Sequence, residues 1–541
     1  MNARSALTTS KKSLNDPRAI EDRRWWILAV LCLSLLIIGM DNTILNVALP
    51  TIQKDLGASA SELQWIVDAY VIIYASILLT TGSLGDRFGR KGALSLGLVI
   101  FGAGSVAAAM ATTSGQLIAF RAVAGIGGAF IMPATLSILT NVFPTHERGR
   151  AIGIWAGVSG LGVVIGPLMG GYLLEHAGWG SVFLINIPIV VVALAAGHVL
   201  IPTSRDPSAP RIDYLGTLLG SVGLASLLFG IIEAPNRGWG DTLVLLGFGV
   251  GLAVLALFIA WELHIDHPML EIHFFRNPSF SGASFAITLV FFAMFGSMYF
   301  LTQYLQFVLQ FSTVKAGAAL IPLAAALMIA APNSARLTRR FGTRGTVAAG
   351  LGIVTIALSV MSRVNIDSGY GLVAVVLVLL GTGMGIAMSP ATESIMGSVP
   401  KEKAGVGSAM NDTTRQIGGA LGVAILGSLT AAHYHSAIDG APFMGRLPAE
   451  ARSAVHDSIG GANFVAAKIG PAAQPIITAA NKAFVDAMSS TVLIAAVVAA
   501  LGAVFAYVVL PSTPADDIEF DPSVLDEGDL PASPVNIPAG D

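Results

Sequence analysis

The sequence carries little charge and a single cysteine. Only 12% of its 541 residues are charged, against roughly 25% in a typical soluble domain. The one cysteine, Cys32, excludes a disulfide within the chain and any metal site built from several cysteines. Because Cys32 lies in an apolar run, we interpret it as a small hydrophobic side chain.

Motifs of catalysis and nucleotide binding are also missing. The chain has no G-x-x-x-x-G-K-[ST] motif, and its stretches "GIGGAF" and "GTGMG" lie inside apolar runs with no strand expected before them. No nucleophile–base set appears, and the nine histidines lack metal-ligand spacing on a shared helix face. We therefore expect neither an enzyme nor an ATP-driven pump, and no metal, cofactor or nucleic acid.

Apolar runs recur along nearly the whole chain, of which 54% is hydrophobic. Many are long enough to cross a bilayer, which takes about 20 residues, and one water-soluble core could not bury so much apolar surface. The sequence thus predicts an all-α polytopic membrane protein with fourteen spans. The expected spans are residues 25–48, 63–82, 92–112, 116–138, 149–172, 180–200, 213–233, 242–262, 280–308, 315–337, 344–362, 369–393, 404–430 and 488–510.

Lysine and arginine are distributed unevenly between the two sides of these spans. With a cytoplasmic N-terminus, 20 of the 30 Lys and Arg fall in cytoplasmic segments, and the short external loops hold only four. Because positive residues favour the inside, we expect a multi-pass protein of the cytoplasmic (inner) membrane with both termini cytoplasmic.

Two short sequences recur in the same order. "DRFGRKG" at 86–92 is matched by "RRFGTRG" at 339–345, and "PATLSI" at 133–138 by "PATESI" at 390–395. The offsets of 253 and 257 residues indicate two parallel repeats of six spans, a common build of secondary transporters. The expected organisation is a cytoplasmic tail at 1–24, six-helix bundles at 25–200 and 280–510, two inserted helices at 213–262, an external loop at 431–487 within the second bundle, and a disordered acidic cytoplasmic tail at 511–541.

Four further motifs occur in order: "GMDNTILNVALP" (39–50), "GSLGDRFGRK" (82–91), "RAVAGIGGAFIMP" (121–133) and "GVVIGPLMGG" (162–171). Together they resemble the first-span, loop, fourth-span arginine and fifth-span antiporter signatures of the major facilitator superfamily, specifically its fourteen-span drug:proton antiporter branch of multidrug and quaternary-ammonium efflux type. "WGSVFLINIP" (179–188) and "SAMNDTTRQIGGALGVA" (408–424) extend the resemblance over nearly all spans. The resemblance implies the major facilitator fold, with two six-helix bundles and two inserted helices.

Three ionisable residues lie inside spans at nearly one depth. Counted at 1.5 Å per residue, Asp41, Asp68 and Arg121 each fall within about 6–9 Å of the outer surface. Burial raises the pKa of a carboxyl group and a nearby guanidinium lowers it, so relative motion of the two can move a proton. We interpret these three residues as proton or cation coupling sites, as the resemblance also implies. The alternative is a static pair that fixes helix packing.

Several other polar and aromatic residues are candidates for substrate contact. Asp412 and Arg415, near the midplane, are spaced i, i+3 and can pair locally, and a transport role is equally open. The run "FFAMFGSMYFLTQY" (291–304) offers aromatic rings that attract organic cations, although packing explains such runs as well. Glu393 lies at the inner end of its span, where a solvated carboxylate costs little, and marks a candidate cytoplasmic mouth. The candidate substrate site comprises Asn42, Asp412, Arg415, Phe292, Phe295 and Tyr299.

The loop motif at 82–91 suits an inner gate. Gly82 permits close helix approach, and Asp86 provides an anion for the N-terminus of a neighbouring helix. The basic residues would hold acidic groups or lipid phosphates. The resemblance implies a latch that closes when the protein faces outward, and a plain positive-inside anchor is the alternative. The gate residues are Gly82, Asp86, Arg87, Gly89, Arg90 and Lys91.

The antiporter motif consists of small residues around a proline. Its glycines permit close helix packing and its proline bends the helix, which favours a hinge or seal over ordinary packing. The motif residues are Gly162, Gly166, Pro167, Gly170 and Gly171.

The leading hypothesis is proton-coupled export of amphipathic, often cationic, drugs and dyes. Its partners are small-molecule substrates, protons and membrane lipids, and we expect a monomer. A second hypothesis is a dedicated exporter of an endogenous lipid, siderophore or peptide, which unrelated dyes should not compete with. A third is a sensor or scaffold without transport, which predicts decayed gate motifs, whereas here they are intact.

Overall fold

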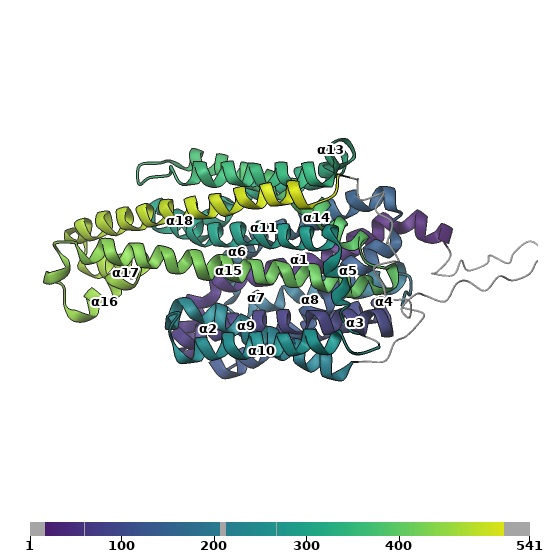
Figure 1. The fold of residues 1–541 in the computed structure, drawn as a ribbon. Coiled ribbons are helices and arrows are strands. Elements are labelled where there is room, and N and C mark those ends of the chain that lie inside the picture. The colour runs from purple at the N-terminus through teal and green to yellow at the C-terminus, as the bar shows by residue number, and fades with distance from the viewer. Residues whose placement is uncertain (1–16, 59, 206–212, 267, 513–541) are drawn as a thin grey trace, which may run out of the picture.

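A bundle of long helices makes up the fold (Figure 1). The computed structural model describes residues 17–58, 60–205, 213–266 and 268–512, and these ranges contain helices and turns but no strand. The apolar runs form helices because a backbone inside a bilayer must satisfy its own N–H and C=O groups, which a helix does within one segment. The tail expected at 511–541 lies almost entirely outside the described residues.

The expected organisation, two bundles with an inserted pair between them, divides the helices into three groups and stays a prediction. The first half contains α1 (Pro17–Leu56), α2 (Ala60–Ser76), α3 (Leu78–Phe88), α4 (Arg90–Ala109), α5 (Ser114–Val142), α6 (Thr145–Ala177), α7 (Ser181–Leu184) and α8 (Asn186–Leu200). The inserted pair is α9 (Tyr214–Arg237) and α10 (Thr242–Glu262). The second half contains α11 (Pro278–Gln303), the π-helix η2 (Tyr304–Val308), α12 (Thr313–Ala318), α13 (Ile321–Met361), α14 (Tyr370–Gly397), α15 (Ala404–Asp439), α16 (Ala449–Asp457), α17 (Ile459–Ile469) and α18 (Gln474–Val509). Single 3₁₀ turns lie at η1 (Ile272–Arg276), η3 (Lys401–Lys403), η4 (Met444–Arg446) and η5 (Pro471–Ala473).

Twelve helices among the described residues are long and apolar enough to cross a membrane, or thirteen when the bent pair α2–α3 is counted as one span. The segment Val314–Met361, which contains α13, is counted as one of these spans. However, α13 alone has 41 residues, so it is about 60 Å long at 1.5 Å per residue, which is twice the thickness of a bilayer core. Gly342 breaks α13 with φ 74° and ψ 168°. Fourteen spans remain a prediction, which this break supports.

The described chain begins and ends at the same end of the bundle (Figure 1). At the opposite end α15 and α18 extend beyond the other helices and carry α16 and α17 between them. Most of the segment expected as an external loop at 431–487 is therefore helical. Tyr434 on α15 donates its hydroxyl hydrogen bond to the Val455 carbonyl of α16 at 3.0 Å, which ties this extension together.

The two recurring loop motifs form similar turns. Gly89, between α3 and α4, has φ 111°, and Gly342, at the matching position of the second half, has φ 74°. Each turn binds the chain that follows the last long helix of its own half. The Arg90 N–H donates to the Ser204 carbonyl at 3.0 Å, and the Arg344 N–H donates to the Pro511 carbonyl at 3.4 Å.

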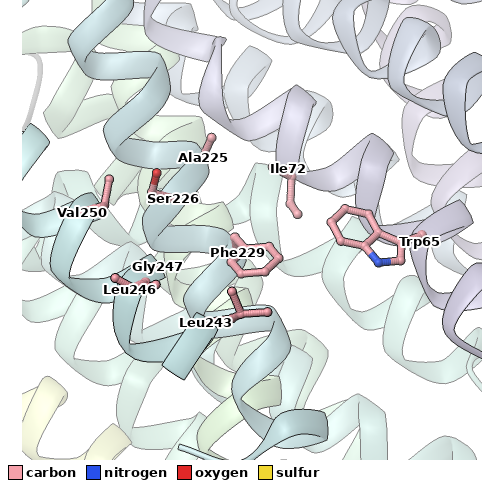
Figure 2. Close-up of a pocket in the computed structure, with 9 residues that line it drawn as sticks. All are labelled: Trp65, Ile72, Ala225, Ser226, Phe229, Leu243, Leu246, Gly247 and Val250. Atoms are coloured by element: carbon pink, nitrogen blue, oxygen red, sulfur yellow. The ribbon is translucent and has the colours of Figure 1, made fainter. Parts of the chain in front are cut away.

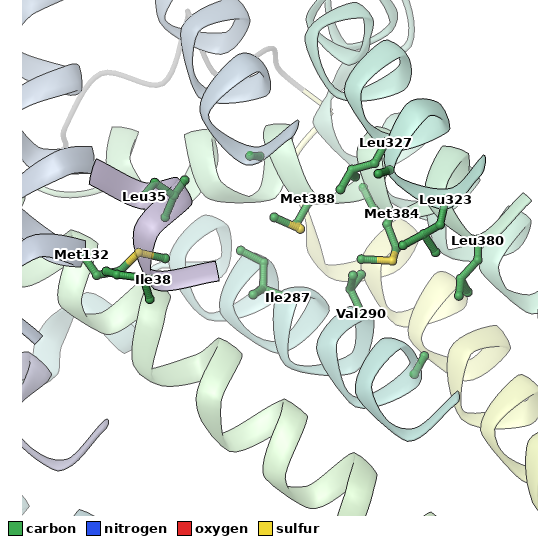
Figure 3. Close-up of a cluster of buried hydrophobic side chains, with 14 of the residues drawn as sticks. Leu35, Ile38, Met132, Ile287, Val290, Leu323, Leu327, Leu380, Met384 and Met388 are labelled. Carbon is green, nitrogen blue, oxygen red and sulfur yellow. The ribbon is translucent and has the colours of Figure 1, made fainter. Parts of the chain in front are cut away.

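A buried hydrophobic cluster extends across both halves (Figure 3). Leu35 and Ile38 of α1 and Met132 of α5 belong to the first half. The second half adds Ile287 and Val290 of α11, Leu323 and Leu327 of α13, and Leu380, Met384 and Met388 of α14. The polar residues described below have apolar surroundings. Burying a polar group costs free energy unless it is hydrogen-bonded, so each of them needs a partner there.

Candidate functional site

Asp41 and Arg121 form a buried ion pair inside the first half. Arg121 Nη1 lies 2.5 Å from Asp41 Oδ2, and each residue is only 1% exposed. Asn186 Nδ2 donates to the other carboxylate oxygen at 3.1 Å. Arg121 Nε donates to the Ile66 carbonyl at 3.1 Å, and its guanidinium lies 4.4 Å from the centre of the Tyr70 ring. Four helices, α1, α2, α5 and α8, thus hold the two charges.

In this arrangement the negative charge of Asp41 can be balanced either by the Arg121 guanidinium or by a proton. Removing one partner of a buried ion pair leaves an uncompensated charge and costs about 3–5 kcal/mol. If a helix movement separated Arg121 from Asp41, protonation of the carboxylate would remove that cost. The ion pair therefore stabilises the present positions of α1 and α5 relative to each other.

The antiporter motif of α6 packs directly beside Asp41. Gly162 lies against Gly39, where a Cβ would come within 2.7 Å of the Gly39 carbonyl carbon. Thr43 Oγ1 donates to the Gly162 carbonyl at 3.1 Å, and a Cβ at Gly166 would collide with the same threonine. Because Gly39 and Thr43 flank Asp41, the glycine face of α6 fixes the position of this part of α1.

The same motif also reaches the second half. A Cβ at Gly171 would collide with Val314 of α12, and Pro167 lies against Gly317 of α12. Gly170 packs on Ile44 of α1. One helix therefore contacts both the segment that carries the buried ion pair and the opposite half.

Asp68 is separate from this ion pair. Its carboxylate accepts a hydrogen bond from Gln64 and lies close enough to Glu233 of α9 to interact with it electrostatically. Asp68 Oδ2 is a buried atom without a hydrogen-bond partner among the described residues. Although Arg121 binds the backbone of α2 two residues earlier, at Ile66, the Asp68 side chain faces the inserted helix pair.

A second buried charge cluster lies between the halves. On α15, Arg415 Nη1 is 3.7 Å from Asp412 Oδ1, so the expected i, i+3 pair is present but loose. Arg415 Nη2 donates to Thr392 Oγ1 of α14 at 3.1 Å. Its guanidinium lies 4.9 Å from the Trp155 ring of α6 and 5.3 Å from the Phe291 ring of α11.

Two polar atoms of this cluster remain unsatisfied. Asp412 Oδ2 and Arg415 Nε are buried and have no hydrogen-bond partner among the described residues. Buried polar groups are normally paired, so such atoms indicate either a bound molecule or a second arrangement of the helices. The cluster could therefore contact a charged substrate.

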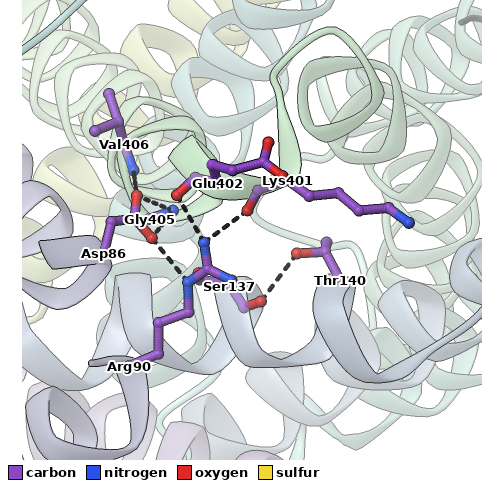
Figure 4. A network of polar contacts seen from close by, with 8 residues as sticks. All are labelled: Asp86, Arg90, Ser137, Thr140, Lys401, Glu402, Gly405 and Val406. Atoms are coloured by element: carbon purple, nitrogen blue, oxygen red, sulfur yellow. Dashed lines mark hydrogen bonds and ion pairs between the residues drawn. The ribbon is translucent and has the colours of Figure 1, made fainter. Parts of the chain in front are cut away.

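The loop between α3 and α4 holds the first half to the second (Figure 4). Asp86 accepts hydrogen bonds from the backbone N–H groups of Gly405, at 2.8 Å, and Val406, at 3.2 Å, which are the second and third residues of α15. Arg90 bridges the same contact, with Nε 2.8 Å from Asp86 Oδ1 and Nη2 donating to the carbonyls of Lys401 and Glu402 at 2.6 and 2.9 Å.

Gly82 allows the two helices to come this close. A Cβ at Gly82 would lie 2.5 Å from the Gly405 carbonyl oxygen and 2.8 Å from the Ala409 Cβ. Asp86 and Arg90 are both buried, at 5% and 2% exposure. The loop is thus built into an interface between the halves, whereas a plain anchor would leave its charges in solvent.

Two other basic residues of this loop have contacts in the first half. Lys91 Nζ donates to the His198 carbonyl at the end of α8 at 2.7 Å, and the Arg87 guanidinium lies 5.4 Å from the Phe88 ring. Gly89 provides the turn between α3 and α4 with a positive φ. The contacts from this loop to η3 and α15 described above come from Gly82, Asp86 and Arg90.

Glu393 differs from the sequence-based expectation. The prediction of a solvated carboxylate was wrong, since Glu393 is only 7% exposed and its carboxylate packs on Gly149 of α6. Ser389, one turn earlier, donates to the Gly149 carbonyl at 3.2 Å. The inner end of α14 is covered because α6 of the other half lies across it.

The aromatic run of α11 lies against glycines of α15. The Phe295 ring contacts Gly419, and a Cβ at Gly422 would meet the backbone of Phe292. Phe295 and Tyr299 keep exposures of 44% and 47%, and Asn42 of α1 is also exposed. Their role in substrate contact stays a prediction.

Four partners of the buried charges were not predicted from the sequence. They are Asn186, Tyr70, Trp155 and Thr392, each of which contacts Asp41, Arg121 or Arg415 as described. A signal existed for Asn186, because an amide in the apolar stretch "FLINIPIV" needs a partner as much as Asp41 does. The other three residues carry no such signal, since aromatic residues and threonine are common in apolar helices.

Comparisons with known proteins give one consistent result. The family model described as Major Facilitator Superfamily matches residues 31–423. The chain is 36% identical over 415 residues to a tetracenomycin C resistance and export protein of Streptomyces glaucescens, covering 76% of this chain and 77% of that protein. It is 35% identical over 476 residues to the multidrug efflux pump LfrA of Mycolicibacterium smegmatis, covering 88% and 94%.

A solved structure agrees in fold. The crystal structure of a bacterial homologue of the human lysosomal transporter Spinster, in an inward-facing and unoccupied conformation, superposes with a TM-score of 0.54 at 22% identity. The match covers 89% of this chain and 97% of that one. Identity this low supports the fold alone.

Proposed function

The chain belongs to the Major Facilitator Superfamily, and from this membership we propose that it is a proton-coupled antiporter that exports amphipathic and cationic drugs and dyes. It is a multi-pass membrane transporter and not an enzyme. The names of its relatives, an antibiotic resistance and export protein and a multidrug efflux pump, support drug efflux as the function. The proton coupling is inferred from the family, and the buried charged residues of the chain support it.

The buried pair of Asp41 and Arg121 is the observation that carries the proposal. Asp41 binds a proton when Arg121 moves away and releases it when the ion pair reforms. The antiporter motif supports this exchange, because α6 packs on both sides of Asp41 and also reaches α12 of the other half. A rotation of the halves would then change the surroundings of Asp41.

The contact of Asp86 with α15 serves as the inner latch in this proposal. It closes one end of the interface between the halves and must open when the transporter faces inward. Asp412 and Arg415 provide the charged part of the substrate site, with unsatisfied atoms at the same interface. Asp68 provides a second protonatable group on the first half.

The proposal includes an orientation and a topology. Fourteen spans place both termini on one side, as the shared end in Figure 1 supports, and the lysine and arginine distribution makes that side cytoplasmic. The protein would act in the cytoplasmic membrane as a monomer, in contact with lipid and with its small-molecule substrates.

A second candidate is a dedicated exporter of one endogenous compound. The similarity to a protein named for tetracenomycin C resistance and export favours this candidate, because that name mentions a single exported compound. Competition separates the two functions. Chemically unrelated dyes should compete with one another in a multidrug exporter and should not in a dedicated one.

Purified protein in liposomes with an imposed pH gradient tests the proposal. We expect uptake or release of a cationic dye that follows the gradient and stops when a protonophore collapses it. The Asp41→Asn variant should bind the dye and fail to move it. Transport by the wild type that ignores the pH gradient would refute proton coupling, and absence of dye transport in gradients of both directions would refute drug export.

A further inference from the structure

A groove opens on the side of the bundle where the inserted pair meets α2 (Figure 2). It has a volume of about 420 Å³, within the ~300–1,000 Å³ typical of sites for drug-sized molecules. Trp65 and Ile72 come from α2, Ser226 and Phe229 from α9, and Leu246 and Val250 from α10. The groove is separate from the interface between the two halves.

The groove opens toward the surface that faces lipid. Leu246 and Val250 are 54% and 44% exposed, and exposed apolar side chains on a membrane helix contact acyl chains. On the inserted pair, the lining residues belong to the first three turns of α10 and to the last four turns of α9. This places the groove toward the end of the bundle opposite the described termini, in the outer leaflet if the proposed orientation holds.

Two aromatic rings form one wall of the groove. The rings of Trp65 and Phe229 stack with their centres 6.1 Å apart and an interplanar angle of 28°. Figure 2 shows Phe229 lying between α9 and the Trp65 side chain. Aromatic faces attract cations, and the attraction is stronger away from water.

A carboxylate lies near the groove, on the helix face that bears Trp65, although it is not among the nine residues that line the groove. Asp68 shares one face of α2 with Trp65 and Ile72, which are three residues before and four residues after it. Its Oδ2 atom is buried and has no hydrogen-bond partner among the described residues, and no ion pair to it occurs among them. The nearby Glu233 is already neutralised by Arg237, whose Nε lies 2.6 Å from Oε2. Asp68 is thus the acid at this position whose charge is not balanced.

We propose that this groove binds lipophilic organic monocations that enter it sideways from the bilayer, with Asp68 as their counter-ion and Trp65 and Phe229 as their aromatic wall. The choice of a cation rests on the proposed export function. An apolar cation concentrates in the membrane before it meets the protein, and a side opening at lipid level is accessible to it there. The exposed apolar rim suits the lipophilic part of such a molecule, and the buried negative charge suits its cationic part.

Cysteine protection tests the groove directly in the full chain. Cys32 is the only cysteine, so Cys32→Ala gives a background without thiols, into which Val250→Cys places one reporter in the groove. Leu252→Cys is the matched control, because it lies on the same helix at nearly the same depth, is 60% exposed and does not line the groove. Both are reacted with N-ethylmaleimide in proteoliposomes, with and without tetraphenylphosphonium.

We expect tetraphenylphosphonium at ten times its Kd to slow modification of Val250→Cys about tenfold, because the free fraction falls as 1/(1 + [L]/Kd). Leu252→Cys should react at an unchanged rate. Tetraphenylborate, which has nearly the same shape and the opposite charge, should protect neither. Adding Asp68→Asn should raise the concentration needed for protection about tenfold, equivalent to about 1.4 kcal/mol.

Other outcomes would overturn the proposal. Equal protection by tetraphenylborate would show that the groove selects apolar shape and not charge. A Val250→Cys reporter that reacts slowly in lipid and quickly in delipidated micelles, without tetraphenylphosphonium, would show that an acyl chain occupies the groove. Dye export is measured in parallel. If dye export is intact but tetraphenylphosphonium does not protect Val250→Cys, the groove proposal is refuted and the proposed function is not. If Val250→Cys is protected but no dye is exported, the proposed function is refuted and the groove proposal is not.

Discussion

The carboxylate of Asp86 accepts the backbone N–H of Gly405 at 2.8 Å, although the two residues are 319 positions apart in the sequence. Gly405 is the second residue of α15, where backbone N–H groups have no partner within the helix and the helix dipole attracts an anion. Asp86 supplies that anion from the opposite half. The two halves are therefore joined by a helix-capping interaction and not only by packing.

Weakening this contact should slow the transport cycle more than it weakens dye binding. In Gly82→Leu the side chain would meet the Gly405 carbonyl oxygen, 2.5 Å from the position of a Cβ, and in Asp86→Asn the capping charge is lost. We expect near-normal dye binding and slow turnover, measured by equilibrium binding and by efflux from proteoliposomes. Gly92→Leu is the control, because its Cβ would meet nothing within 4 Å. Equal loss of binding in the Gly82 and Asp86 variants would instead indicate misfolding.

Replacing Asp41 by asparagine should abolish proton-driven efflux and leave the protein inserted and folded. Asparagine keeps the shape of the side chain but does not titrate, so the exchange between proton and Arg121 is lost. Asp55→Asn provides the comparison, because Asp55 is near the end of the same helix and exposed. Efflux driven by a pH gradient is the measurement, and a wild-type rate in Asp41→Asn at equal expression would contradict the role of Asp41.

Two protonatable groups on the first half predict electrogenic exchange of monovalent cations. One cation exchanged for one proton moves no net charge, whereas a second proton adds about 2.3 kcal/mol per 100 mV of membrane potential, or roughly 50-fold in the attainable gradient. Wild-type efflux should therefore slow when valinomycin and potassium collapse the potential at a fixed pH gradient. Asp68→Asn should either stop export or make it insensitive to the potential. Unchanged wild-type efflux would contradict a second proton at Asp68 and leave this residue with its proposed role as counter-ion of the groove or with packing.

The turn at Gly342 should tolerate alanine poorly. Its φ of 74° and ψ of 168° lie in a region that essentially only glycine adopts, which costs roughly 1–3 kcal/mol for other residues, and the new methyl group would also meet the Ser512 carbonyl. We expect Gly342→Ala to lower the unfolding midpoint in detergent. Gly352→Ala, a helical position of α13 with nothing within 4 Å, should raise it slightly, because alanine favours the helix. A fall of the same size in both variants would count against the strained turn.

The all-helical fold could be predicted from the sequence, because it leaves a local pattern, whereas the duplication of a six-span unit stays a prediction. Long apolar runs predict the helices, and the repeated loop motif predicts that Gly89 and Gly342 are equivalent, as their positive φ angles agree. The exact number of spans was less accessible. Composition does not reveal that α2 and α3 meet at an angle of 49°.

The sequence predicts how deep the candidate site residues lie in the membrane, but not the direction in which their side chains point. Counting residues places Asp41, Asp68 and Arg121 at similar levels, and the structure joins two of them. Which way each side chain faces depends on the rotation of its helix, and that rotation is set by packing on distant segments. Asp68 therefore faces α9, and Glu393 is covered by α6, for reasons that no local pattern contains.

The long separation between Asp86 and Gly405 also sets an order of assembly during synthesis. Ribosomes add about 5–20 residues per second, so roughly 16–64 s pass between the appearance of the two residues. During that interval the first half has to reside in the membrane without α15. Arg90, which lies 2.8 Å from Asp86 and only four residues away, neutralises the carboxylate from the start. The nascent first half thus carries one partner for this charge before its other partners, on α15, have been translated.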